Sequence, residues 1–112
     1  MIVVIFESWP TGARKYVVMG EALQNLSESQ VGFISIERFR SISDPDKLVA
    51  LSFWRDEASV DLWRSNDLHR DIQARSRQEL FRDYRLRVAA VFRDYGKFDR
   101  ESAPSDSRQA NP

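Results

Sequence analysis

Residues 53–70 read FWRDEASVDLWRSNDLHR and hold two of the three tryptophans and the only histidine of the chain. The segment starts in an apolar strand and continues into a short helix, whose first turn Asp56 can cap with its carboxylate. Ser65 and Asn66 interrupt that helix, and either side chain can cap the next one. We therefore expect any chemistry of this chain to lie in this segment, which the rest of the chain holds against a sheet.

The sequence on either side of this segment predicts the remaining strands and helices. Apolar and β-branched runs predict strands at residues 2–6, 31–40, 48–54 and 84–95. Apolar residues at helical spacing predict helices over about 13–26, from about 57, and over about 67–81. A short Asp-Pro turn between the second and third strands favours an antiparallel hairpin. This order predicts an α+β domain of the ferredoxin-like βαββαβ type, a four-stranded antiparallel sheet with helices on one face.

The end of the chain differs in composition from the rest. After Gly96 the residues are mostly charged or small and polar, with little apolar surface to bury. We therefore expect one domain over residues 1–96 and a disordered polar tail over residues 97–112.

Composition limits the classes of function. The 17 basic and 17 acidic residues balance, which argues against a nucleic-acid partner held by bulk electrostatics. The absence of cysteine excludes disulfides, thiolate metal sites, iron–sulfur clusters and cysteine nucleophiles. The apolar start of the chain is too short for a signal peptide, and no apolar run approaches the length of a membrane span. We expect a cytoplasmic protein without a membrane partner.

The predicted sheet has one face that the helices cannot cover. The strands at 2–6 and 48–54 are apolar on both faces, so the uncovered face would be a large exposed apolar patch. Soluble monomers rarely expose such a patch. A second copy of the same face covers it most simply, which predicts a homodimer with a two-fold interface through the sheet.

Three side chains of the segment 53–70 are candidates for chemistry, and each has a simpler alternative. His69 falls in the first turn of a helix, where the positive end of the helix dipole favours a neutral imidazole that can accept a proton. It can equally be a half-buried histidine that bonds to its neighbours. Trp63 can form a pocket wall or pack in the core. Asn66 can hold a substrate oxygen with its amide or simply cap a helix.

Aromatic residues from several elements can line a pocket between helices and sheet, or form an aromatic core. The candidates for substrate binding are Tyr16, Phe33, Phe53 and Tyr84. The sequence has no glycine-rich phosphate loop, no nucleophile elbow and no zinc motif. We therefore expect neither a metal nor an organic cofactor.

Several short stretches resemble the antibiotic biosynthesis monooxygenase family. They read GFISIERF at 32–39, LSFWRDEA at 51–58 and DYRLRV at 83–88, with Trp63-Arg64, His69-Arg70 and the later Arg93-Asp94-Tyr95-Gly96. The likeness extends over about residues 1–96 and implies the dimeric α+β barrel of that family.

The resemblance also implies a chemistry. Some members oxygenate polyaromatic phenols or hydroquinones without metal or flavin, so the substrate itself supplies the electrons. Deprotonation gives an electron-rich anion that reacts with dioxygen, while the protein orients the substrate, excludes water and stabilises the anion. On this chain the resemblance makes His69 the base or anion partner, Trp63 a pocket wall and Asn66 a donor to the substrate oxygen.

Other relatives leave two alternatives open. Some have no demonstrated activity, so a non-catalytic dimer that binds a small molecule is the second hypothesis. Haem-degrading relatives have a helix histidine about ten residues after a tryptophan and an asparagine on the first strand. Haem binding is the third hypothesis. This chain departs from that pattern at both places, with Gln73 ten residues after Trp63 and with Glu7 and Ser8 rather than asparagine on the first strand.

Overall fold

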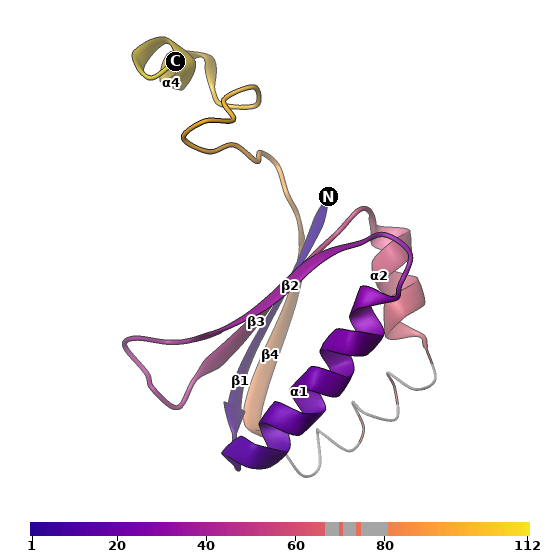
Figure 1. Cartoon of the computed structure of the whole chain (residues 1–112). Coiled ribbons are helices and arrows are strands. Elements are labelled where there is room, and N and C mark those ends of the chain that lie inside the picture. The colour runs from indigo at the N-terminus through magenta and orange to yellow at the C-terminus, as the bar shows by residue number, and fades with distance from the viewer. Residues whose placement is uncertain (67–69, 71–73, 75–80) are drawn as a thin grey trace.

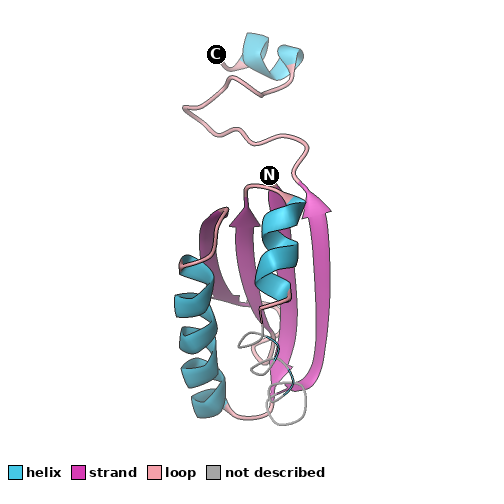
Figure 2. Cartoon of the chain, turned by 90° about the vertical axis from the view of Figure 1, so that its right-hand side faces the viewer, coloured by secondary structure: helices cyan, strands magenta, loops and turns pink. Residues whose placement is uncertain are grey.

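A four-stranded antiparallel sheet forms the centre of the molecule. The computed structural model describes residues 1–66, 70, 74 and 81–112. The elements are β1 (Ile2–Pro10), α1 (Ala13–Glu28), β2 (Phe33–Arg40), β3 (Leu48–Trp54), α2 (Glu57–Arg64), β4 (Phe81–Ala90) and α4 (Ser105–Ala110). The strand order is β2-β3-β1-β4, with every neighbouring pair antiparallel. Both views place α1 and α2 on the same side of the sheet (Figure 1 and Figure 2), which confirms the predicted ferredoxin-like α+β fold.

Side chains alternate between the two faces of each strand, and the buried positions identify the face that the helices cover. Val4 on β1, Trp54 on β3 and Val60 on α2 form the buried core cluster. We call this side of the sheet the inner face. The opposite side, which no described helix covers, is the open face.

Several strand boundaries differ from the predicted ones. β2 begins at Phe33 rather than at residue 31, and β4 ends at Ala90, so residues 91–95, which were predicted as strand, lie beyond it. β1 continues through Glu7 and Ser8 to Pro10, because the polar residues still pair with β3 or β4. Phe81, predicted as the last residue of a helix, begins β4 and pairs with Pro10 across a register shift in β1. Its ring meets that of Phe6 edge-on at 5.4 Å between centroids, a cross-strand contact that the helical spacing of the sequence does not reveal.

The predicted disordered tail contains a short helix. After β4 the chain passes the N-terminus and ends in α4, away from the sheet (Figure 1). Arg100 donates hydrogen bonds to Gly96 O, to the backbone and side-chain oxygens of Ser107, and to Asn111 O, at 2.6–3.2 Å. One guanidinium with several donors can thus organise a polar segment that has little apolar surface. The division of the chain at residue 96 stays a prediction.

None of the helices in the described part of the chain is both long enough and apolar enough to cross a membrane.

Candidate functional site on the inner face of the sheet

Helix α2 is fixed to the end of the sheet by its first turn. Asp56 is the N-cap residue, and its Oδ1 accepts hydrogen bonds from Ser59 N at 2.9 Å and from Ser59 Oγ at 2.6 Å. Gly32, at φ +80°, lies against the same serine, since a Cβ at that glycine would lie 1.9 Å from Ser59 Oγ. Arg55 N donates to Gly32 O at 2.7 Å, which ties the start of β2 to the end of β3. These contacts set the direction of α2 across the inner face.

Hydrogen bonds to Asp56 depress its pKa. Those from the Ser59 hydroxyl and backbone, followed by that from Arg55, lower the pKa from 3.8 to about 2. A carboxylate with a lowered pKa stabilises the fold above its unfolded pKa, and that contribution is lost as pH falls through the folded value. For Asp56, this contribution to stability is therefore lost as the pH falls from 3.8 to about 2, and we call this range the acid window.

We expect Asp56→Asn to weaken the acid sensitivity of the fold within the acid window. Asparagine is a comparable N-cap but carries no charge, so stability near neutral pH should stay close to that of the wild type. The urea midpoint measured as a function of pH should therefore fall less steeply for the variant. Glu21→Gln, on the exposed surface of α1, serves as the control and should follow the wild-type curve. Parallel profiles for wild type and Asp56→Asn would contradict this assignment.

A tryptophan cluster occupies one end of the inner face. Trp54 is fully buried, and its Nε1 donates to Ser52 Oγ at 3.0 Å. Trp63, near the end of α2, lies over it with ring centroids 5.0 Å apart and planes 37° apart. Phe33 of β2 meets Trp54 edge-on at 5.5 Å. The tryptophan cluster therefore joins α2 to two strands.

A second aromatic group lies further along the same face, between β1 and β4. Phe6 contacts Phe81 at 5.4 Å and Tyr84 at 5.6 Å, and the rings of Phe81 and Tyr84 are 6.2 Å apart. Phe6 shares the inner face with Val4 because the two are two residues apart on β1. We call Phe6, Phe81 and Tyr84 the β1–β4 aromatic cluster. Tyr84 is 40% exposed, so this cluster retains accessible aromatic surface.

Ser8 lies beside the β1–β4 aromatic cluster and was not among the predicted site residues. It stands opposite Tyr84 on β4 and Leu48 on β3. The residue is 0% exposed, and within the described part of the chain its Oγ has no hydrogen-bond partner. The alternation Ile2, Val4, Phe6 places this hydroxyl on the same face as those side chains, but because residues 2–6 are all apolar, the sequence does not show that this is the face that the helices cover.

The structure brings together only some of the predicted site residues. Phe33 and Trp63 meet at Trp54, and Tyr84 belongs to the β1–β4 aromatic cluster on the same face. Asn66 follows α2, where its N–H donates to Trp63 O and its C=O accepts from Arg70 N. His69 lies outside the described residues, as does the side chain of Tyr16 on α1.

Phe53 does not lie between the helices and the sheet, where it was predicted. It precedes Trp54 on β3 and pairs with Val3 on β1. Successive strand residues point to opposite faces, so the burial of Trp54 among the helices places Phe53 on the open face. An apolar run such as 48–54 does not disclose which of its two faces the helices cover.

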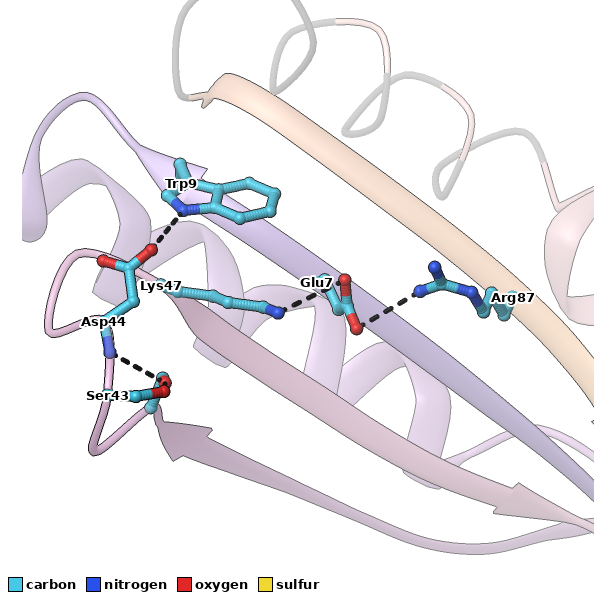
Figure 3. A network of polar contacts seen from close by, with 7 residues as sticks. Glu7, Trp9, Ser43, Asp44, Lys47 and Arg87 are labelled. Carbon is cyan, nitrogen blue, oxygen red and sulfur yellow. Dashed lines mark hydrogen bonds and ion pairs between the residues drawn. The ribbon is translucent and has the colours of Figure 1, made fainter.

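The open face carries a polar network at one end (Figure 3). Glu7 on β1 forms ion pairs with Lys47 at 3.4 Å and with Arg87 on β4 at 3.2 Å. Desolvation raises the pKa of Glu7, but the hydrogen bond from Arg87 and the charges of Lys47 and Arg87 outweigh it and leave the pKa below 4.5. Beside this network, Trp9 Nε1 donates to Asp44 Oδ2 at 3.0 Å. Glu7 is therefore held as a carboxylate between two cations.

Comparison with known proteins identifies relatives in sequence and in fold. A curated relative from Pyricularia oryzae, named jasmonate monooxygenase ABM, is 37% identical over an alignment of 93 residues. The match covers 81% of this chain but 43% of that protein. The chain thus spans less than half the length of this relative.

The solved structures that are similar share the fold at low identity. SnoaB, described as a cofactor-independent oxygenase from Streptomyces nogalater, has a TM-score of 0.73 at 11% identity, covering 83% of this chain and 94% of its own. A conserved protein from Methanosarcina mazei has a TM-score of 0.72 at 18% identity, covering 79% of this chain and 89% of its own.

The family model described as antibiotic biosynthesis monooxygenase matches residues 1–75, which include β1, α1, the β2–β3 hairpin and α2. This match extends over well more than half of the chain and agrees with the resemblance noted in the sequence. The chain belongs to the antibiotic biosynthesis monooxygenase family.

Proposed function

We propose that this chain is a cofactor-independent monooxygenase that uses dioxygen to oxygenate a quinol-like or polyaromatic phenolic small molecule. The observation that carries the proposal is the pair of aromatic clusters on the inner face, around Trp54 and around Phe6. Aromatic side chains bind planar aromatic ligands by stacking and edge contacts, and a mostly apolar site with few polar groups is typical of small-molecule binding. Family membership supports the reaction class, as does the similarity in fold to SnoaB, a cofactor-independent oxygenase.

The proposed reaction needs a deprotonated substrate in dry surroundings. The resemblance to the family implies that His69 is the base or anion partner, with Asn66 as a donor to the substrate oxygen and Trp63 as a wall of the site. An apolar environment strengthens the interaction of each polar group with the developing anion. For an anthrone, the reactive CH₂ carbon is oxidised to a carbonyl. One atom of dioxygen becomes the carbonyl oxygen, and the other combines with the two hydrogens of the CH₂ group and leaves as water. The substrate supplies all four electrons, so the balance requires no further reductant.

Oxygen uptake with a panel of hydroquinones and anthrones tests the proposal. We expect saturable uptake by the wild type and a loss of roughly 100-fold or more in His69→Ala, the range typical for removal of a general base. The control is Arg64→Ala, at the end of α2 with a side chain 65% exposed, which should keep the wild-type rate. Equal background uptake by wild type and His69→Ala would reject the proposal.

Further measurements distinguish the proposed function from its alternatives. Jasmonic acid belongs in the panel because the relative that is 37% identical is named a jasmonate monooxygenase, and uptake with this alicyclic oxo acid alone would change the substrate class. A probe that binds saturably, with a thermal shift that is the same with and without oxygen and no oxygen uptake, would indicate a non-catalytic binding protein. A Soret shift on adding haemin would favour haem binding.

We also propose that the chain is a homodimer through the open face of the sheet. Five apolar residues of the two central strands share this face: Val3, Ile5, Val49, Leu51 and Phe53. The network around Glu7 borders them with charge, which is the pattern of an apolar interface centre and a polar rim. Dimerisation would leave the inner face of each copy available for the substrate.

A further inference from the structure

We propose that the Ser8 hydroxyl is the specificity-determining group of the inner face, which hydrogen-bonds an oxygen substituent of an aromatic ligand lying against the β1–β4 aromatic cluster. The inference rests on the proposed function, because it places the phenolic substrate of that reaction. It adds a residue to which neither the family match nor the relatives' names assign a role.

The first support is a completely buried hydroxyl that the described part of the chain leaves without a hydrogen bond. Ser8 is 0% exposed, and its Oγ has no hydrogen-bond partner among the described residues. Burying an unpaired hydroxyl is destabilising, and such groups in folded proteins usually have a partner. Because Ser8 is 0% exposed, a ligand oxygen reaches it only when the atoms that cover it move, and it would then supply the partner that the described side chains do not.

The hydroxyls of two other buried serines form hydrogen bonds that stabilise the fold. Ser52, 4% exposed and also on the inner face, accepts the indole N–H of Trp54 at 3.0 Å. Ser59, 2% exposed, donates to the Asp56 carboxylate at 2.6 Å. Both hydroxyls hold elements of the fold together. Ser8 differs from them because its Oγ makes no such bond to any residue that the structure describes.

The neighbours of Ser8 determine which kind of ligand would fit. Phe6 precedes it by two residues on the same face of β1, and Tyr84 stands directly opposite on β4. Opposite residues in antiparallel strands have Cα atoms roughly 4.5–5.5 Å apart, so the hydroxyl lies at the border of the aromatic cluster. A flat ring packed on these aromatic side chains would bring a substituent on its edge to Ser8.

The chemistry of a hydroxyl suits the oxygen atoms of the proposed substrates. A serine Oγ can both donate and accept, and therefore pairs with a phenol, a phenolate or a carbonyl oxygen. A site that hydrogen-bonds a ligand hydroxyl discriminates against the analogue that lacks it, because the protein group is then left unpaired. Ser8 should therefore distinguish oxygenated rings from the parent hydrocarbon.

The test is anaerobic binding of two matched probes, 1-naphthol and naphthalene, followed by quenching of tryptophan fluorescence. We expect the wild type to prefer 1-naphthol and Ser8→Ala to bind it about 10-fold more weakly, as for the loss of one hydrogen bond. The affinity of Ser8→Ala for naphthalene should remain near the wild-type value.

Ser52→Ala is the matched control, since it removes an equally buried hydroxyl from the same face. It should lower Tm by breaking the bond from Trp54 while it keeps the preference for 1-naphthol over naphthalene. Ser8→Ala should keep or raise Tm in the absence of ligand, because it removes a hydroxyl that has no partner among the described residues.

The outcomes separate this inference from the proposed function. An unchanged naphthol-to-naphthalene ratio in Ser8→Ala, or no preference for 1-naphthol in the wild type, overturns the role of Ser8 even if oxygen uptake is observed. A lost preference in Ser8→Ala without oxygen uptake by the wild type confirms the ligand contact and rejects the monooxygenase.

Discussion

Replacing Trp54 with alanine is expected to lower the free energy of unfolding by about 3–5 kcal/mol, the usual cost of deleting a buried large aromatic side chain. Trp54 is 0% exposed and contacts both Phe33 of β2 and Trp63 of α2. The substitution also leaves the Ser52 hydroxyl without the indole N–H that it now accepts. Small domains are stable by only about 5–15 kcal/mol, so this variant should lie close to the limit of folding.

Urea denaturation followed by far-UV circular dichroism measures this effect. Trp54→Phe keeps an aromatic ring but loses the indole hydrogen bond, and its midpoint should fall between those of the wild type and Trp54→Ala. Leu62→Ala is the control on the neighbouring helix, since Leu62 is 62% exposed and its loss should change stability by only about 0.5 kcal/mol. A wild-type midpoint for Trp54→Ala would show that the tryptophan cluster does not hold α2 on the sheet.

The order of the elements could be predicted from the sequence because it depends on local patterns. The β-branched run at 2–6 and the Asp-Pro turn before β3 each indicate structure within a few residues. Boundaries depend on pairing between distant strands. Phe81 continues a helical spacing in sequence, but its partner is Pro10, some 70 positions earlier, so only the folded sheet reveals it as the start of β4.

The site was predicted less completely for a related reason. Phe53 and Trp54 are adjacent aromatic residues of one strand, and the packing of α2 decides which of them faces the helices. Phe33 and Trp63 could be proposed because large aromatic side chains bury most of their surface, either in a core or in the wall of a pocket. Ser8 belongs to no motif. It is of interest because it is buried without a hydrogen-bond partner among the residues at 1–66, 70, 74 and 81–112, which is a property of the folded chain.

Replacing Leu51 with glutamate is expected to dissociate the proposed homodimer. Leu51 lies on the central strand β3, paired with Ile5 of β1, in the middle of the apolar residues of the open face. A carboxylate there would lose its water in the dimer without a partner of opposite charge, a much larger cost than at the rim. The dimer dissociation constant should rise by roughly 30-fold or more, as for a central interface residue.

Sedimentation velocity over a range of concentrations measures this change, with the wild type expected at twice the 13.1 kDa chain mass. Val31→Glu introduces the same side chain in the loop before β2, where Val31 is 65% exposed, and should leave the dimer intact. A wild type that stays monomeric at every concentration, or a Leu51→Glu variant that dimerises like the wild type, would contradict the proposed interface. Circular dichroism on the same samples separates dissociation from unfolding. Because a two-fold axis brings the same patch of both copies together, one substitution places two carboxylates in the interface, so the cost of removing water from a carboxylate appears twice in the dimer.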